Sequence, residues 1–149
     1  MEPFATKLVA HAREAAKHAH APYSKFFVGA ALLTAEGEII TGFNIENVSY
    51  GLTLCAERAA MVHALCRGHK KFAAVAVCAG SAENPATPCG ACRQFLAEFL
   101  APETPVFFAG LPEGSRVERT TVGGLLPMGF QMDAPPLFSE NIQLPISNS

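Results

Sequence analysis

The chain has 149 residues, of which half are apolar and 16% are charged, and its formal net charge at pH 7 is −2. This length suits one domain, and the mildly acidic balance argues against a general affinity for nucleic-acid backbones. The longest apolar runs, residues 26–33 and 72–79, are too short to cross a bilayer, so we expect neither a nucleic-acid partner nor a membrane partner.

Local sequence patterns predict that strands and helices alternate. In chain order, we expect a helix over 3–20, strands over 26–34 and 39–44, a helix over 55–66, a strand over 72–78, a helix over 89–100, a strand over 105–109, a polar loop over 110–119 and a helical turn over 122–126. Gly29 in the first strand indicates a bulge or a close backbone approach. The pattern predicts an α/β layered fold with a mixed sheet, in one domain over 1–130 with an irregular tail over 131–149.

The five cysteines point to a metal site or to thiol chemistry. Charged residues near the N-terminus interrupt any apolar signal sequence, so we expect a cytoplasmic protein with reduced thiols. Cys66 and Cys78 lie within apolar patterns, and we expect both to be buried small side chains. The high apolar content also predicts that part of the surface is covered in a subunit interface.

The other three cysteines have the spacing of a metal site. Cys89 and Cys92 form a C-x-x-C pair, which can bind one ion from a single turn, and Cys55 can complete the set from another segment. Three protein ligands leave the fourth tetrahedral position of a zinc ion open, which is the arrangement of catalytic zinc. Two alternatives remain open, namely a redox dithiol formed by Cys89 and Cys92 and a structural metal site.

Two charged residues beside Cys55 could act with such a metal. Glu57 is a candidate proton carrier, although a glutamate favoured by the helix dipole would have the same position. Three thiolates around zinc leave a net negative charge, which helix N-termini or hydrogen bonds from Arg58 would have to offset. Arg58 could instead form a surface ion pair.

The cysteine segments resemble the zinc nucleoside and nucleobase deaminases. Residues 55–57 match the metal-ligand and glutamate segment of that signature, and residues 88–92 match its P-C-x-x-C segment. More narrowly, the chain resembles the small homotetrameric cytidine deaminases, in segments 23–32, 44–47, 55–60, 88–94 and 125–130. This resemblance implies a three-layer α-β-α fold around a mixed central sheet.

The resemblance also implies a metal site and a proton carrier. Cys55, Cys89 and Cys92 would hold one zinc ion per subunit, and Glu57 would move the proton. The residues implied in binding the substrate are Phe26, Asn44, Ile45, Glu46 and Ala56.

Four of these residues have an implied contact. Phe26 would stack on the pyrimidine ring, Asn44 and Glu46 would bind the ribose hydroxyls, and the backbone of Ala56 would hold the base. Tyr50 and Phe130 would reach the pocket of a neighbouring subunit, so that a homotetramer shares its active sites. From sequence pattern alone, Phe26 could equally be a core residue, and Asn44 and Glu46 could be turn residues.

The implied reaction is the hydrolytic deamination of cytidine, and of deoxycytidine, to uridine or deoxyuridine and ammonia, a step of pyrimidine salvage. The 44–47 segment favours a ribonucleoside. A blasticidin-type or other nucleoside or nucleobase deaminase on the same zinc site is an alternative, and a C-x-x-C thiol oxidoreductase is an alternative from another class. Residues 131–149 have no clear counterpart in the family.

Overall fold

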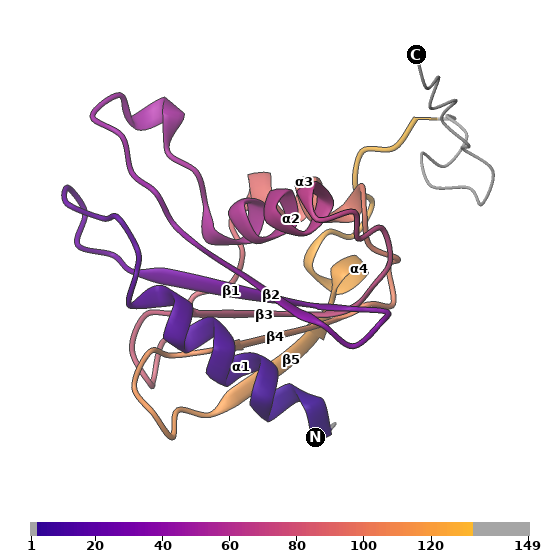
Figure 1. The fold of residues 1–149 in the computed structure, drawn as a ribbon, viewed down its shortest axis with the longest axis horizontal. Coiled ribbons are helices and arrows are strands. Elements are labelled where there is room, and N and C mark those ends of the chain that lie inside the picture. Colours follow the sequence, from indigo (N-terminus) through magenta and orange to yellow (C-terminus); the bar gives the residue numbers. More distant parts are fainter. Residues whose placement is uncertain (1–2, 133–149) are drawn as a thin grey trace, which may run out of the picture.

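A mixed five-stranded sheet forms the centre of the molecule, in the order β2-β1-β3-β4-β5. The computed structural model describes residues 3–132, and Figure 1 shows helices on both faces of this sheet. The elements are α1 (Pro3–Ala16), β1 (Val28–Thr34), β2 (Ile39–Phe43), the 3-10 turn η1 (Tyr50–Leu52), α2 (Ala56–Cys66), β3 (Phe72–Ala79), α3 (Gly90–Ala97), β4 (Pro105–Ala109), β5 (Val117–Thr121) and α4 (Val122–Leu125). Strands β3 and β4 pair in parallel, whereas the other neighbouring strands of the described sheet pair antiparallel.

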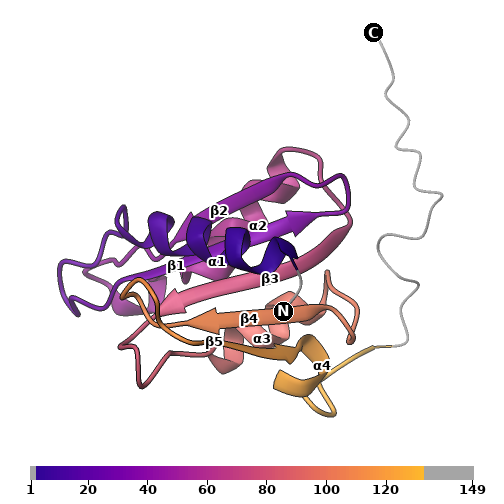
Figure 2. The same cartoon turned by 90° about the horizontal axis from the view of Figure 1, so that it is seen from below.

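Helices cover the two faces of the sheet separately. Helix α1 lies on one face, while α2 and α3 lie on the other, as the view from below in Figure 2 shows. The α1 face buries Leu8 and Phe107, and the opposite face buries Met61 and Leu96. Each large aliphatic side chain that is fully buried contributes about 1.5–3 kcal/mol to stability, so both layers depend on such residues. The predicted three-layer arrangement with a mixed central sheet is confirmed.

Two strand glycines allow these helices to approach the sheet closely. A Cβ atom at Gly29 would lie 1.9 Å from the carbonyl oxygen of Ala12 in α1. A Cβ atom at Gly42 would lie 2.3 Å from the backbone nitrogen of Ala60 in α2. Since neither position has room for a side chain, the close approach predicted at the first glycine is confirmed. The irregularity in strand pairing lies at the far end of β1 instead.

Apart from shifts of one or two residues at other element ends, three predicted elements differ from the observed ones. Helix α1 ends at Ala16, because residues 17–19 continue only as tight backbone turns. Helix α3 ends at Ala97, three residues before the predicted end. The loop expected over 110–119 contains the start of β5, an edge strand paired with β4. Strand β5 was not predicted because its side chains are polar, and an edge strand with partly exposed residues needs no apolar run.

The expectation that Cys66 is buried is wrong. Cys66 is exposed and shares the outer face of α2 with Val62, one turn earlier, which is 44% exposed. Cys78 is buried as expected, and its thiol donates to the carbonyl oxygen of Val9 at 3.4 Å. The two thiols therefore differ in access to solvent.

The described part of the chain ends at residue 132, soon after α4. The tail predicted over 131–149 lies outside the described residues except for its first two positions. Among the helices of the described part, none combines the length and the apolar character that a bilayer span requires.

Candidate functional site

Three cysteine sulfurs meet where α2 and α3 begin. Cys55 immediately precedes α2, and Cys89 has the same position before α3. The Sγ atoms of Cys55, Cys89 and Cys92 all lie within 4.8 Å of one another, and those of Cys55 and Cys89 are 4.0 Å apart. Zinc–sulfur bonds of about 2.3 Å in a tetrahedron hold sulfurs about 3.8 Å apart, so the cluster has the size of a zinc site.

The electrostatics of the cluster favour a thiolate at Cys55. Hydrogen bonding from Cys92 and then from Arg58 lowers the pKa of the Cys55 thiol to about 5. The pKa of Cys92 is raised, because its proton is shared with the Cys55 sulfur and because its side chain is buried. Sulfurs this close together repel one another when ionised, so a cation among them favours the thiolate form of all three. This donor set fits zinc, for which thiolates are common ligands.

Glu57 lies in the first turn of α2 and is only 4% exposed. Burial raises the pKa of its carboxyl group, and the negative charge at Cys55 adds to that effect. A glutamate that served only the helix dipole would remain in water. A buried carboxyl beside a thiol cluster instead indicates a chemical role.

Arg58 contacts the thiol cluster directly. Its Nη2 donates to Cys55 Sγ at 3.4 Å and to the carbonyl oxygen of Thr53 at 3.2 Å. These contacts place a positive charge beside the sulfur, and they hold the loop before α2 against the helix. These contacts are the ones that offsetting the thiolate charge would require, and that role of Arg58 stays a prediction.

A cavity of about 290 Å³ connects the cluster to the loop before β1 and the loop after β2. Its lining residues are Ser24, Phe26, Val28, Asn44, Glu46, Thr53, Cys55, Ala56, Glu57, Val77, Ala79, Ala86, Thr87 and Cys89. Phe26 is 47% exposed, which excludes a role in the core of the described chain. One cavity is therefore lined by two of the three thiols, the buried carboxyl, an accessible aromatic ring and two polar side chains.

Asn44 and Glu46 form the polar part of this cavity. Asn44 is buried, its Nδ2 donates to the carbonyl oxygen of Phe26 at 2.8 Å, and its Oδ1 accepts from the N–H of Val28 at 2.9 Å. Glu46 accepts hydrogen bonds from the turn before Phe26. Each side chain has hydrogen-bonding capacity left for a ligand, since an amide offers two donors and two acceptor positions.

Five residues of the predicted site are not among the residues that line the cavity, namely Cys92 and Arg58, which belong to the thiol cluster, and Ile45, Tyr50 and Phe130. The backbone of Ile45 exchanges two hydrogen bonds with Leu54, which close the loop leading to α2. Tyr50 and Phe130 are 72% and 74% exposed. Their side chains are accessible from outside the subunit.

Sequence reasoning assigned no role to Arg93, which fixes the loop that carries Cys89. Its guanidinium donates to the carbonyl oxygens of Pro88 at 2.7 Å and Leu125 at 3.1 Å, and to Thr87 Oγ1 at 3.0 Å. The sequence did contain a signal for this role, because Arg93 lies four residues beyond Cys89, in the first turn of the helix that Cys89 precedes. Its contacts join the start of α3 to the end of α4.

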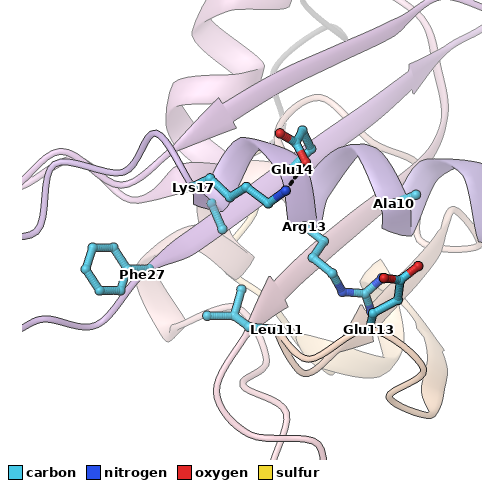
Figure 3. A pocket seen from close by; sticks show the side chains of 8 residues that line it. Ala10, Arg13, Glu14, Lys17, Phe27, Leu111 and Glu113 are labelled. Carbon is cyan, nitrogen blue, oxygen red and sulfur yellow. Dashed lines mark ion pairs between the residues drawn. The ribbon is translucent and has the colours of Figure 1, made fainter.

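A second and larger cavity, of about 630 Å³, lies beside α1 on the opposite face of the sheet (Figure 3). Its lining residues are Ala10, Arg13, Glu14, Ala16, Lys17, Phe27, Leu111 and Glu113. This set contains no thiol and no imidazole, and Glu14 is paired with Lys17 at 2.5 Å. The smaller cavity has the metal-binding chemistry, so we place the functional site there.

Comparison with known proteins agrees with this choice. The profile of the cytidine and deoxycytidylate deaminase zinc-binding region matches residues 3–108. The chain belongs to this family. It is 47% identical over 127 residues to the cytidine deaminase of Sporosarcina psychrophila, an alignment that covers 85% of this chain and 91% of the relative. The crystal structure of cytidine deaminase from Burkholderia pseudomallei matches with a TM-score of 0.79 and 43% identity, over 84% of this chain and 98% of that one.

Membership of the family decides between the alternatives for the three thiols. The cytidine deaminase of Halalkalibacterium halodurans is also similar, with 46% identity over 83% of this chain and 91% of that relative. A zinc-binding family and a cluster of three thiols agree with one zinc ion per chain. A redox dithiol would leave both the third thiol and the buried Glu57 in the same cavity without a role.

Proposed function

We propose that this chain hydrolyses cytidine to uridine and ammonia, and deoxycytidine to deoxyuridine, as a step of pyrimidine salvage. The observation that carries the proposal is the composition of the 290 Å³ cavity. Two ligand thiols and the buried Glu57 lie at one part of it, and Phe26, Asn44 and Glu46 lie at another. A nucleoside has a matching division between a reactive base and a polar sugar.

Cys55, Cys89 and Cys92 are the proposed zinc ligands. Zinc in such a site supplies Lewis-acid chemistry that makes a water molecule nucleophilic near neutral pH. Arg58 and the two helix N-termini stabilise the thiolates around it. This chain therefore contributes the ligand set and the charges that balance it.

Glu57 is the proposed proton carrier. As the C4–O bond forms, the carboxylate takes a proton from the attacking water and gives it to the ring nitrogen N3. It then moves the second proton from the new hydroxyl to the amino group, the C4–N bond breaks, and ammonia leaves. Burial of Glu57 keeps bulk water away from both transfers.

The proposed substrate contacts follow the lining of the cavity. Phe26 stacks on the pyrimidine, which suits an aromatic ring that is half exposed at the cavity. Asn44 and Glu46 bind the sugar hydroxyls, because together they can donate to and accept from hydroxyl groups. The backbone of Ala56 holds the base, and Ile45 supports these residues by closing the loop.

We further propose a homotetramer in which Tyr50 and Phe130 reach the cavity of a neighbouring subunit. The support is their exposure, together with that of Val48 and Leu52, which are 76% and 71% exposed beside Tyr50. Exposed apolar side chains clustered in one loop are typical of an interface. Residues 1–130 are the proposed catalytic domain, and the cytoplasm is the proposed location.

The deciding experiment follows the ultraviolet absorbance of cytidine with wild type and Glu57→Gln. We expect the cytidine absorbance to decay with wild type only, at a rate that Glu57→Gln reduces by about 10²-fold or more, since it removes the proton carrier. Glu103→Gln removes an equally charged but exposed side chain and serves as the matched control. A wild-type protein loaded with zinc that leaves cytidine unchanged would contradict the proposal.

A further inference from the structure

Ser24 lies between the two groups that are proposed to hold the nucleoside. Its hydroxyl donates to Oε1 of Glu46 and accepts from the backbone N–H of Phe26 at 3.0 Å. The backbone N–H groups of Ser24 and Tyr23 donate to Oε2 of Glu46 at 3.2 and 2.9 Å. A single turn therefore binds the carboxylate and the backbone of the aromatic residue at the same time.

These three bonds define what Glu46 can still accept. A carboxylate offers about four acceptor positions. Oε2 accepts both backbone bonds and Oε1 accepts one bond, from Ser24, so the remaining position is on Oε1. The same contacts lower the pKa of Glu46, and the Ser24 hydroxyl contributes most. The group is thus held ionised, with one oxygen left for a ligand.

The backbone conformation of the turn supports this arrangement. Lys25 has a φ of 59°, in the left-handed region that residues other than glycine rarely adopt. Its N–H donates to the carbonyl oxygen of Ala21 at 3.1 Å. Ser24 and Phe26 both line the cavity, whereas Lys25 between them does not. A strained residue at this point is typical of a functional site.

We propose that Ser24 is a positioning residue for the reaction. Its hydroxyl orients the Glu46 carboxylate toward a sugar hydroxyl, and it fixes the backbone that carries Phe26. The inference rests on the proposed deamination of cytidine and adds to it a residue that contacts no reacting atom. Without the hydroxyl, only the two backbone bonds to Oε2 hold Glu46, so Oε1 can turn about them, and recognition of the sugar is no longer tied to placement of the ring.

The test compares Ser24→Ala with Ser24→Thr on two substrates, cytidine and 2′,3′-dideoxycytidine, which lacks the 2′ and 3′ hydroxyls of the sugar. We expect Ser24→Ala to lower kcat/KM for cytidine about tenfold, mainly by raising KM, as for loss of a hydrogen bond to a charged group. Ser24→Thr keeps the hydroxyl and restores most of that loss. With 2′,3′-dideoxycytidine the loss in Ser24→Ala is about threefold at most, because Glu46 has no hydroxyl to bind.

A double-mutant cycle tests whether Ser24 acts through Glu46. In a Glu46→Ala background, Ser24→Ala is expected to add little to the loss for cytidine, since the carboxylate that it orients is gone. Equal losses on both substrates, or additive losses in the cycle, would overturn the role of Ser24 while the deaminase activity stands. A wild type inactive on cytidine would overturn the proposed function itself, so the two failures are distinguishable.

One measurement is independent of turnover. A ¹³C carboxyl titration is expected to show a higher pKa for Glu46 in Ser24→Ala than in wild type. An unchanged pKa would contradict the hydrogen bond on which the inference depends. If Ser24→Ala does not fold, Ser24→Cys keeps the side-chain volume with a weak donor and carries the same comparisons.

Discussion

The side-chain amide of Asn44 extends the β1–β2 hairpin by one further step toward the cavity. The last strand pair of the hairpin joins Gly29 to Phe43, and just beyond it the backbone N–H of Asn44 donates to the carbonyl oxygen of Val28 at 3.2 Å. Beyond it, Asn44 Nδ2 donates to the carbonyl oxygen of Phe26 at 2.8 Å, and Asn44 Oδ1 accepts from the N–H of Val28 at 2.9 Å. The aromatic ring at the cavity therefore depends on an amide from the neighbouring strand.

Asn44→Asp should destabilise the protein and weaken binding of cytidine. The change replaces the Nδ2 donor by an acceptor that faces the carbonyl oxygen of Phe26, at a cost of about 1–3 kcal/mol. For a chain of this size we expect the Tm to fall by roughly 3–10 °C and the KM for cytidine to rise. Asn47→Asp is the matched control, because Asn47 Oδ1 only accepts, from the N–H of Ser49 at 2.8 Å. Unchanged melting of Asn44→Asp would contradict the prediction.

Arg58→Ala should weaken zinc binding. The guanidinium donates to Cys55 Sγ at 3.4 Å, and loss of such support for a ligand typically lowers metal affinity by about 10–100-fold. Competition with a chromophoric chelator measures this affinity directly. Arg67→Ala, at the end of the same helix and paired with Glu38, is expected to keep the wild-type value. Equal zinc affinities of the two variants would remove Arg58 from this role.

The thiol cluster could be predicted from sequence because the residues of each half lie close together in the chain. Cys89 and Cys92 share one turn, and Cys55, Glu57 and Arg58 begin one helix, so each half of the site follows from short-range spacing. Only the meeting of the two halves in one place depends on the fold of the chain. Helices α2 and α3 precede and follow β3 and share one core layer, which brings their starts to the same face of the sheet.

The polar part of the cavity depends on long-range contacts, and it was harder to predict. The first strand begins at Val28, two residues later than expected, because the preceding residues turn toward Glu46 instead of pairing in the sheet. Ser24 and Arg93 were visible in the sequence, but their partners lie 22 and up to 32 residues away. Strand β5 was missed because its residues are polar at a sheet edge.

Gly29→Ala should severely destabilise the fold. The added Cβ atom would lie 1.9 Å from the carbonyl oxygen of Ala12, so α1 would have to move away from the sheet. Overpacking of a close-packed core costs typically 1–3 kcal/mol and more where backbone must shift, and we expect about 3 kcal/mol or more here. Gly51→Ala, where nothing lies within 4 Å of the added atom, is the control in urea denaturation. A small change for Gly29→Ala would mean that α1 is not pressed against β1.

Removal of zinc by a chelator should change the reactivity of particular thiols. Metal-bound Cys55 and Cys89 are expected to resist iodoacetamide in the zinc-loaded protein, and to be alkylated once the ion is gone. Cys66 is exposed and should react in both forms. Cys78 should react in neither, because burial raises the pKa of its thiol to about 11.

Mass spectrometry of proteolytic peptides resolves these thiols one by one, and loss and recovery of cytidine turnover follow the same samples. A lower Tm of the metal-free form is also expected, since a ligand that binds only the folded state stabilises it. The exposed and the buried cysteine serve as internal standards for access and for unfolding. Alkylation of Cys55 and Cys89 at equal rates with and without zinc would show that these thiols do not hold the ion.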